Sequence, residues 1–306
     1  MVNLAVDLCG ITIDNPVIPA SGIFNYGYEF ADYYDINCLG TFSFKGTTRE
    51  PRFGNPQPRI AEYDFGVLNA TGLENPGVDA VIAEEFPKLK KVFHKPVIAN
   101  MVGKSVEEYA ECAAMLTVPG ISALEVNISC PNVHGGGMAY GTDAQAAAEV
   151  TGAVRKVTDK PVIMKLSPNV TDITEIARAC EAEGADGLCL INTLMGMRID
   201  LHRRAPLLAN TTGGMSGPGI FPLALRMVYQ TYEAVKIPII GVGGISHARG
   251  VVEMMMAGAT AVEIGAANLV DPYICPTIIK SLPAVMKGLR IEDINDIIGA
   301  AHPDKR

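Results

Sequence analysis

One short segment of the sequence combines a cysteine with amide side chains and glycines. Residues 127–132 read Asn-Ile-Ser-Cys-Pro-Asn, and residues 135–137 are all glycine. A thiolate is a usable general base, because the pKa of a free thiol is about 8.5 and falls in electropositive surroundings. We therefore predict that Cys130 accepts a proton, and we read the other six cysteines as core residues. Ser129 is a weaker candidate nucleophile, because no histidine and acid pair is placed to activate it.

Lys45 and Lys165 each end an apolar run. A lysine buried at such a point needs an anionic or electron-rich partner. One lysine could form a Schiff base, whereas two favour charge stabilisation, for example of a reduced flavin. For either lysine alone, a snorkelling or salt-bridged strand end is the alternative.

Glycines mark a candidate phosphate site. Gly243 and Gly244 end an apolar run and precede a helix-like stretch, and Gly265 ends the next run. Backbone N–H groups at such turns suit an anion, although tight turns alone also require glycine. The glycine-rich residues 213–219 are a third candidate phosphate-facing turn.

Apolar runs and helix-like stretches alternate along most of the chain. The predicted strands span residues 15–20, 38–44, 96–100, 123–127, 161–166, 187–192, 237–242 and 261–265. The predicted helices span residues 106–116, 143–157, 172–183, 220–235, 247–257, 276–287 and 291–298. Eight such units favour a (β/α)8 TIM barrel formed by a single domain, residues 1–306, with reactive groups at the carboxyl ends of the strands.

Two segments lie outside this repeat. Residues 4–13 predict a short N-terminal β-hairpin that closes the bottom of the barrel, and residues 47–95 predict an elaborated loop region after strand 2 that crosses the active-site face. An open nucleotide-binding sheet is the alternative fold. It is disfavoured because residues 20–22, Ala-Ser-Gly, stand where a G-x-G-x-x-G turn is expected.

Composition excludes several functions. The chain has 25 Lys and Arg against 33 Asp and Glu, a net charge of -8, which disfavours nucleic acid as a partner. It contains no apolar run of the roughly 20 residues that span a bilayer and no signal-like start, so we expect a cytoplasmic protein without membrane contact. Seven cysteines without a C-x-x-C pair predict neither disulfides nor an iron–sulfur site, and the histidines show no metal-ligand spacing.

Four motifs together resemble the class 1 dihydroorotate dehydrogenases along essentially the whole chain. They are residues 69–73 (NATGL), 127–132 (NISCPN), 213–218 (GGMSGP) and 241–245 (GVGGI). Cys130 separates the sequence from class 2 enzymes, which have serine there. Residues 41–48 and 192–200 are most similar to the NAD-linked class 1B catalytic subunit.

The resemblance implies that dihydroorotate is oxidised to orotate in de novo pyrimidine (UMP) biosynthesis. Cys130 would remove the C5 proton while a hydride leaves C6 for N5 of FMN. The implied substrate-binding residues are Lys45, Asn69, Thr71, Gly72, Leu73, Asn127, Asn132, Asn192 and Thr193. The implied FMN-binding residues are Ala20, Ser21, Gly22, Lys45, Asn100, Asn127, Lys165, Ile191, Gly217, Gly243, Gly244, Gly265 and Ala266.

Class 1B enzymes pass electrons from FMN to NAD through a separate subunit that holds FAD and a [2Fe–2S] cluster. The resemblance therefore implies such a partner, and a homodimer as the core of a heterotetramer. The sequence departs from the family pattern at His134, where lysine is common, and at Ala266, which replaces a threonine whose hydroxyl often meets the phosphate.

Other functions stay open at this point. They are a fumarate-linked class 1A enzyme, another FMN barrel acting on a different dihydropyrimidine, a Schiff-base aldolase using Lys165, and a barrel that binds a ligand without catalysis. A tRNA dihydrouridine synthase also uses a cysteine, but the acidic composition argues against RNA.

Overall fold

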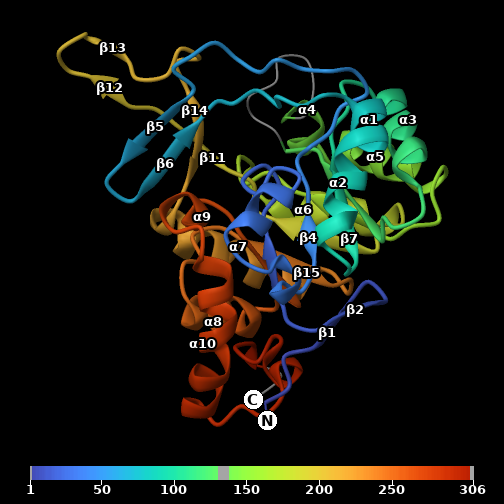
Figure 1. Cartoon of the computed structure of the whole chain (residues 1–306), viewed down its shortest axis with the longest axis vertical. Helices are drawn as coiled ribbons and strands as arrows, with labels where there is room; N and C mark the ends of the chain where they lie inside the picture. Colours follow the sequence, from blue (N-terminus) through green and yellow to red (C-terminus); the bar gives the residue numbers. More distant parts are fainter. Residues whose placement is uncertain (1, 130–137, 304–306) are drawn as a thin grey trace.

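The computed structural model of the chain describes residues 2–129 and 138–303. Eight parallel strands form one sheet around the centre of the molecule, in the order β3-β16-β15-β10-β9-β8-β7-β4 (Figure 1). Gly40, just before β4, donates its backbone N–H to the carbonyl oxygen of Val17 in β3 at 3.0 Å and joins the two ends of this order. The predicted (β/α)8 barrel is confirmed.

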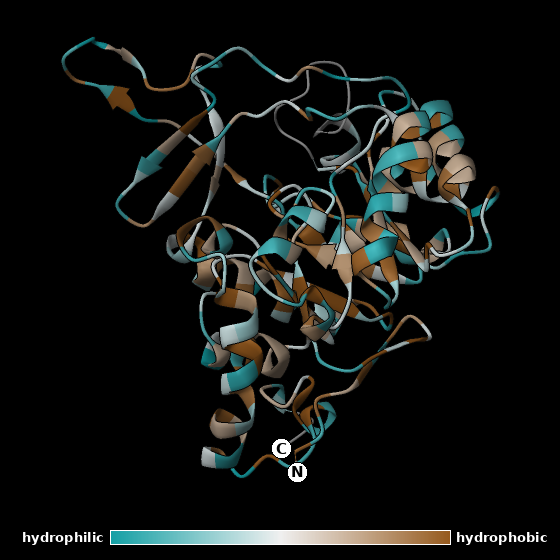
Figure 2. Cartoon of the chain, viewed as in Figure 1, coloured by the Kyte–Doolittle hydropathy of each residue, from teal (hydrophilic) through white to brown (hydrophobic). Residues whose placement is uncertain are grey.

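Each barrel strand overlaps one of the predicted apolar runs. The strands are β3 (Val17–Pro19), β4 (Phe42–Ser43), β7 (Val97–Met101), β8 (Ala123–Asn127), β9 (Val162–Lys165), β10 (Gly187–Leu190), β15 (Ile239–Val242) and β16 (Ala261–Ile264). All of their residues are buried, as expected for a parallel sheet covered on its outer face by helices and filled inside by side chains. Figure 2 shows the hydrophobic colours that run through this part of the molecule.

Helices follow most strands. They are α1 (Val78–Ala80), η3 (Val81–Glu85), α2 (Phe86–Val92), α3 (Val106–Leu116), α4 (Met138–Gly141), α5 (Ala144–Arg155), α6 (Ile173–Ala182), η4 (Pro218–Ile220), α7 (Phe221–Ala234), α8 (Ala248–Met256), α9 (Ala267–Val270) and α10 (Ile274–Gly288). Side chains cap the first turns of α3, α5, α6 and α8, for example Asp143, which accepts from the N–H of Ala146 at 2.8 Å. Two short 3₁₀ helices, η1 (Tyr28–Asp32) and η2 (Ile36–Cys38), join β3 to β4.

The prediction of a helix over residues 291–298 is wrong. The segment forms only the short 3₁₀ helix η5 (Ile294–Ile297), because its backbone pairs with the N-terminal segment instead. Ile294 donates to the carbonyl oxygen of Asn3 at 3.0 Å, and Asn3 donates to that of Glu292 at 2.8 Å. The two chain ends therefore lie together at one end of the barrel (Figure 1).

The predicted N-terminal hairpin is confirmed. Strands β1 (Val6–Leu8) and β2 (Ile11–Ile13) pair antiparallel around Cys9 and Gly10, both of which have positive φ. Cys9 Sγ donates to the carbonyl oxygen of Asp186, the residue that precedes β10. The hairpin thus covers the amino-terminal ends of the strands, opposite the expected site.

The region after strand 2 is more ordered than predicted. Residues 47–95 contain β5 (Ile60–Tyr63) and β6 (Gly66–Asn69), which join β11 (Leu194–Gly196) and β14 (Gly213–Ser216) in an antiparallel sheet of order β11-β14-β6-β5. A small hairpin of β12 (Ile199–Asp200) and β13 (Ala205–Pro206) projects beyond this sheet, at the upper left of Figure 1.

Residues 78–92 also form a helical crossover, whereas the sequence predicted only an elaborated loop there. Pro87 lies inside this continuous helical stretch, directly after the π-helical turn η3, where the wider turn accommodates a residue that has no backbone N–H. In the described part of the chain, no helix has both the length and the apolar character needed to cross a membrane.

We predict that Gly40→Ala weakens the closure of the barrel. An added Cβ would lie 1.9 Å from the carbonyl oxygen of Asn15, so the backbone must shift. We expect the free energy of unfolding, measured by urea denaturation, to fall by about 1–3 kcal/mol. The control is Gly288→Ala, where a Cβ meets nothing within 4 Å; its stability should be unchanged or up to about 1 kcal/mol higher. Equal stability of both variants would contradict the prediction.

Candidate functional site

A cavity of about 260 Å³ opens at the carboxyl ends of the barrel strands. Every barrel strand ends at its wall. The antiparallel sheet β11-β14-β6-β5, called the extra sheet below, also contributes to the wall through β6 and β14. All the predicted site residues that the structure describes line this cavity: Ala20, Ser21, Gly22, Lys45, Asn69, Thr71, Gly72, Leu73, Asn100, Asn127, Lys165, Ile191, Asn192, Thr193, Gly217, Gly243, Gly244, Gly265 and Ala266. Cys130, Asn132 and His134 lie outside the described residues.

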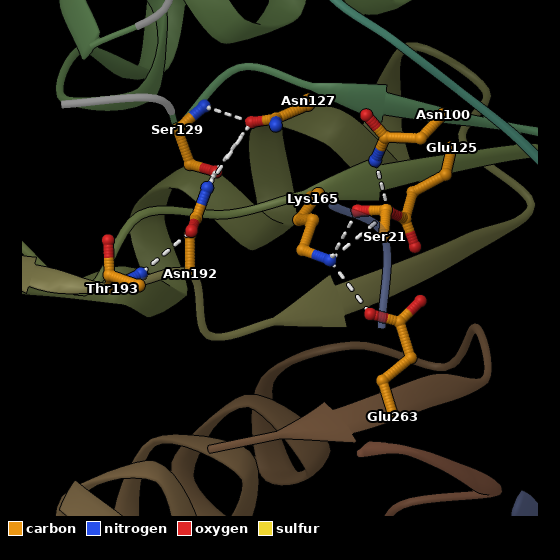
Figure 3. A network of polar contacts seen from close by, with 9 residues as sticks. All are labelled: Ser21, Asn100, Glu125, Asn127, Ser129, Lys165, Asn192, Thr193 and Glu263. Carbon is orange, nitrogen blue, oxygen red and sulfur yellow. Dashed lines mark hydrogen bonds and ion pairs between the residues drawn. The ribbon is translucent and has the colours of Figure 1, made fainter. Parts of the chain in front are cut away.

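The floor of the cavity holds a buried ionic cluster (Figure 3). Lys165, the last residue of β9, places its Nζ 3.1 Å from Oε1 of Glu125 and 2.7 Å from Oε2 of Glu263. Both carboxyl groups are fully buried, and the Lys165 side chain is only 5% exposed. The anionic partners that a buried Lys165 requires are therefore these two glutamates.

Hydrogen bonds from two more elements fix the carboxyl group of Glu125. Oε1 accepts from Nδ2 of Asn100, at the end of β7, and from Oγ of Ser21, after β3, at 3.2 Å. Ser21 Oγ also accepts from Lys165 Nζ at 3.4 Å. Side chains on or directly after β3, β7, β8 and β16 thus hold Lys165 in one orientation, Asn100 acting through Glu125.

The charges of the cluster depend on one another. Burial lowers the pKa of Lys165, but Glu125 and Glu263 outweigh that effect and hold it well above its usual value, so Lys165 is an ammonium. Burial raises the pKa of Glu125, but the charge of Lys165 and the hydrogen bonds around its carboxyl group lower it to about 2. For Glu263, burial and repulsion by Glu125 raise the pKa well above its usual value.

A second network arranges amide side chains on another part of the wall (Figure 3). The backbone N–H and Oγ of Ser129 both donate to Oδ1 of Asn127, at 3.1 and 2.9 Å. Asn192 Nδ2 donates to Oγ of Ser129 at 2.8 Å, and its Oδ1 accepts from the N–H of Thr193 at 2.8 Å. Ser129 is fully buried and holds these amides, a role that differs from that of a nucleophile.

Glycines form the part of the wall that follows β15 and β16. Gly244 has φ +72°, and an added Cβ there would lie 2.7 Å from the backbone nitrogen of Phe221. At Gly265 a Cβ would meet only Ala20, at 3.8 Å, which leaves the backbone accessible. The predicted third turn, residues 213–219, is partly wrong. Gly213–Ser216 form β14, and only Ser216, Gly217 and Pro218 of this segment line the cavity.

Sequence reasoning missed Glu125 and Glu263. The available signal was a single carboxylate inside a short apolar strand, in Ala-Leu-Glu-Val-Asn and in Ala-Val-Glu-Ile. A fully buried glutamate is rare unless it is paired. The two glutamates therefore indicated that a buried cation lies nearby, just as Lys165 indicated a buried anion.

Comparison with known proteins identifies the family. The family model described as dihydroorotate dehydrogenase matches residues 3–286. The chain belongs to the dihydroorotate dehydrogenase family. It is 55% identical over 302 residues to a protein of Halalkalibacterium halodurans named dihydroorotate dehydrogenase B (NAD(+)), catalytic subunit, with 98% of this chain and 99% of that protein covered.

Proteins of Enterococcus faecalis and Bacillus cereus with the same name are 53% and 51% identical. The alignments cover 96% and 98% of this chain, and 95% and 97% of those proteins. The family and its NAD-linked B type, both predicted from the motifs, are confirmed.

We predict that Lys165→Met destabilises the fold strongly. The substitution leaves two buried carboxyl groups without their cation, a loss that typically costs about 3–5 kcal/mol. Urea denaturation should show this loss, and the triple variant Lys165→Met/Glu125→Gln/Glu263→Gln, which removes the stranded acids, should recover most of it. Wild-type stability of Lys165→Met would contradict the paired arrangement.

Proposed function

We propose that this chain is the catalytic subunit of an NAD-linked dihydroorotate dehydrogenase, which oxidises dihydroorotate to orotate in de novo pyrimidine biosynthesis. The observation that carries the proposal is the single cavity that all the described predicted site residues share. The names of the relatives, which match along nearly the whole chain, support the same activity. We further propose that residues 1–306 act as one domain and that the protein is cytoplasmic.

The cavity has the features needed to hold FMN. The phosphate would lie beside backbone N–H groups of the glycine-containing loops after β15 and β16, where Gly265 leaves open space, since an added Cβ would meet only Ala20, at 3.8 Å. Asn100 Oδ1 is buried in the wall without a hydrogen-bond donor among the described residues, so a bound donor would satisfy it. The ammonium of Lys165 would face the part of the group that becomes negative. When bound, FMN would supply the acceptor for the hydride from C6 of the substrate.

Amide side chains would bind the substrate. Dihydroorotate carries a carboxylate and a ring with amide donors and acceptors, and asparagine offers both functions. Asn127 and Asn192 are held in place by Ser129, while Asn69 lines the cavity from the end of β6. Lys45 would pair with the carboxylate, and residues 71–73, Thr193 and Asn132 would complete the site.

Cys130 would act as the base that takes the proton from C5. Asn127, three residues before Cys130 in the sequence, lines the cavity, as does Lys45. A cation such as Lys45 near the thiol would favour the thiolate.

Electrons would leave through a partner subunit that carries FAD and a [2Fe–2S] cluster, with a homodimer of this chain as the core of a heterotetramer. The composition of this chain supports the need for a partner. Among the described residues, the one group of three close potential metal-ligating side chains contains a single cysteine, Cys189, whereas such a cluster is held by several cysteines.

The Schiff-base aldolase reading of Lys165 is not supported by the site. Such an enzyme needs a neutral amine as nucleophile. Here two carboxyl groups keep Lys165 protonated and occupy its N–H groups.

Cys130→Ala tests the proposed base. We expect the anaerobic rate of flavin reduction by dihydroorotate, measured by stopped-flow absorbance, to fall at least about 100-fold, while FMN binding is retained. Cys38→Ala, a substitution in η2 away from the cavity, should leave the rate unchanged. A Cys130→Ala variant with the wild-type rate would refute the assignment of the base.

Ala266→Thr tests the proposed phosphate loop. A hydroxyl at the start of α9 would add one hydrogen bond to the phosphate, and a net contribution of about 0.5–1.5 kcal/mol corresponds to a roughly 2- to 12-fold lower Kd for FMN. Fluorescence titration of the flavin-free chain measures it. Ala266→Val, which has the same shape without the hydroxyl, should show no gain. Equal affinities of both variants would place the phosphate elsewhere.

A further inference from the structure

The cluster at the floor of the cavity contains two acids for one base. Glu125, on β8, and Glu263, on β16, are both fully buried, and Lys165 lies between them (Figure 3). Fully ionised, the cluster would carry a net negative charge on two carboxyl groups that are both fully buried. An uncompensated buried charge is strongly unfavourable, and such groups usually change protonation state instead.

Two carboxyl oxygens of the cluster lack a hydrogen-bond donor among the described residues. Oε1 of Glu125 and Oε2 of Glu263 accept from the described donors. Oε2 of Glu125 and Oε1 of Glu263 are buried and have no donor among the described residues. The carboxyl groups lie close together, with one ligand oxygen of each and Sγ of Cys189 all within 4.8 Å of one another. A proton on one acid would satisfy an acceptor on the other.

The surroundings differ between the two acids. Glu125 accepts from Asn100, Ser21 and Lys165, all of which favour its ionised form, whereas Glu263 accepts from Lys165 alone among the described donors. Among the described residues, the third titratable group beside the two acids is Cys189 on β10; burial raises the pKa of its thiol well above its usual value, so it adds no charge. Glu263 is therefore the better place for a proton.

We propose that Glu125 and Glu263 share one proton, held mainly by Glu263, so that the cluster with Lys165 is neutral. Glu263 is then a positioning residue: it orients Lys165 without cancelling the positive field that Lys165 directs into the cavity. Two ionised acids would instead make this wall negative and oppose an anionic group beside it. The link to a flavin rests on the proposed function, whereas the protonation state does not.

Infrared spectroscopy of the full-length chain without substrate tests the proton directly. A protonated carboxyl group gives a carbonyl stretch above the amide band that shifts in D₂O. We expect the difference spectrum, wild type minus Glu263→Gln, to show this band at neutral pH. Glutamine imitates the protonated acid in shape and donor capacity, so the variant keeps the cluster intact but lacks the protonated carboxyl group. Glu175→Gln, an exposed substitution on α6, should leave it in place. The proposal would be overturned if the wild-type spectrum lacked this band, or if the band were still present in Glu263→Gln.

The reduction potential of bound FMN gives a second, independent test of the same charge count. With one shared proton, Glu125→Gln and Glu263→Gln each leave the net charge of the cluster unchanged, since the remaining acid ionises. We therefore expect little change in potential for either single variant and a rise for the double variant, which leaves Lys165 unpaired. A stepwise rise, with each single variant already shifted, would mean that both acids are ionised and would overturn the proposal.

The two tests separate this inference from the proposed function. The infrared band requires neither flavin nor dihydroorotate, so it can be present in a chain that fails to oxidise dihydroorotate. Conversely, a fully active dehydrogenase without the band would keep the proposed function and lose the shared proton. If the double variant does not fold, the wild-type and Glu263→Gln spectra still decide the question.

Discussion

The pairing of Lys165 with two buried carboxyl groups constrains the whole upper half of this barrel. Lys165 ends β9, Glu125 comes from the adjacent β8, and Glu263 from β16, which two strands separate from β9. Asn100 from β7 and Ser21 after β3 complete the contacts. Five strands must therefore keep their register for the cluster to form, and in return the cluster fixes one positive charge at the floor of the cavity. A barrel provides this arrangement because its parallel strands converge at one face.

Two chemical kinds of residue, glycines and asparagines, are prominent among those that line the cavity around Lys165. Glycine-containing loops after β15 and β16 line one part of the cavity, while asparagines on or after β8, β10 and β6 line another and offer both donors and acceptors. This division fits a flavin phosphate on one side and a small amide-containing acid on the other, in keeping with membership of the dihydroorotate dehydrogenase family. The extra sheet, formed by segments from two βα loops, builds the upper wall of the cavity.

Local signals were sufficient to predict the barrel, because each strand is a short apolar run and four of the helices between strands, α3, α5, α6 and α8, begin at a side-chain cap. Site residues at strand ends could be predicted for the same reason, as the barrel geometry gathers them. The extra sheet could not, because Asn69 in β6 pairs with Gly214 in β14, 145 residues away, and neither strand is distinctive alone. The sequence indicated that Lys165 needs an anionic partner but not which one. Glu263 lies 98 residues further on, and only the closed barrel brings its Oε2 to 2.7 Å from Nζ of Lys165. The helical stretch of residues 78–92, which combines a π-helical turn with Pro87, was not predicted either.

The most direct measurement is anaerobic mixing of the purified chain with dihydroorotate while the visible flavin absorbance is followed. We expect a yellow protein whose absorbance falls on mixing, and we expect that NAD added without a partner subunit does not restore the absorbance. A colourless protein that cannot take up FMN, or a flavin that dihydroorotate leaves oxidised, would refute the assignment of this chain as the catalytic subunit.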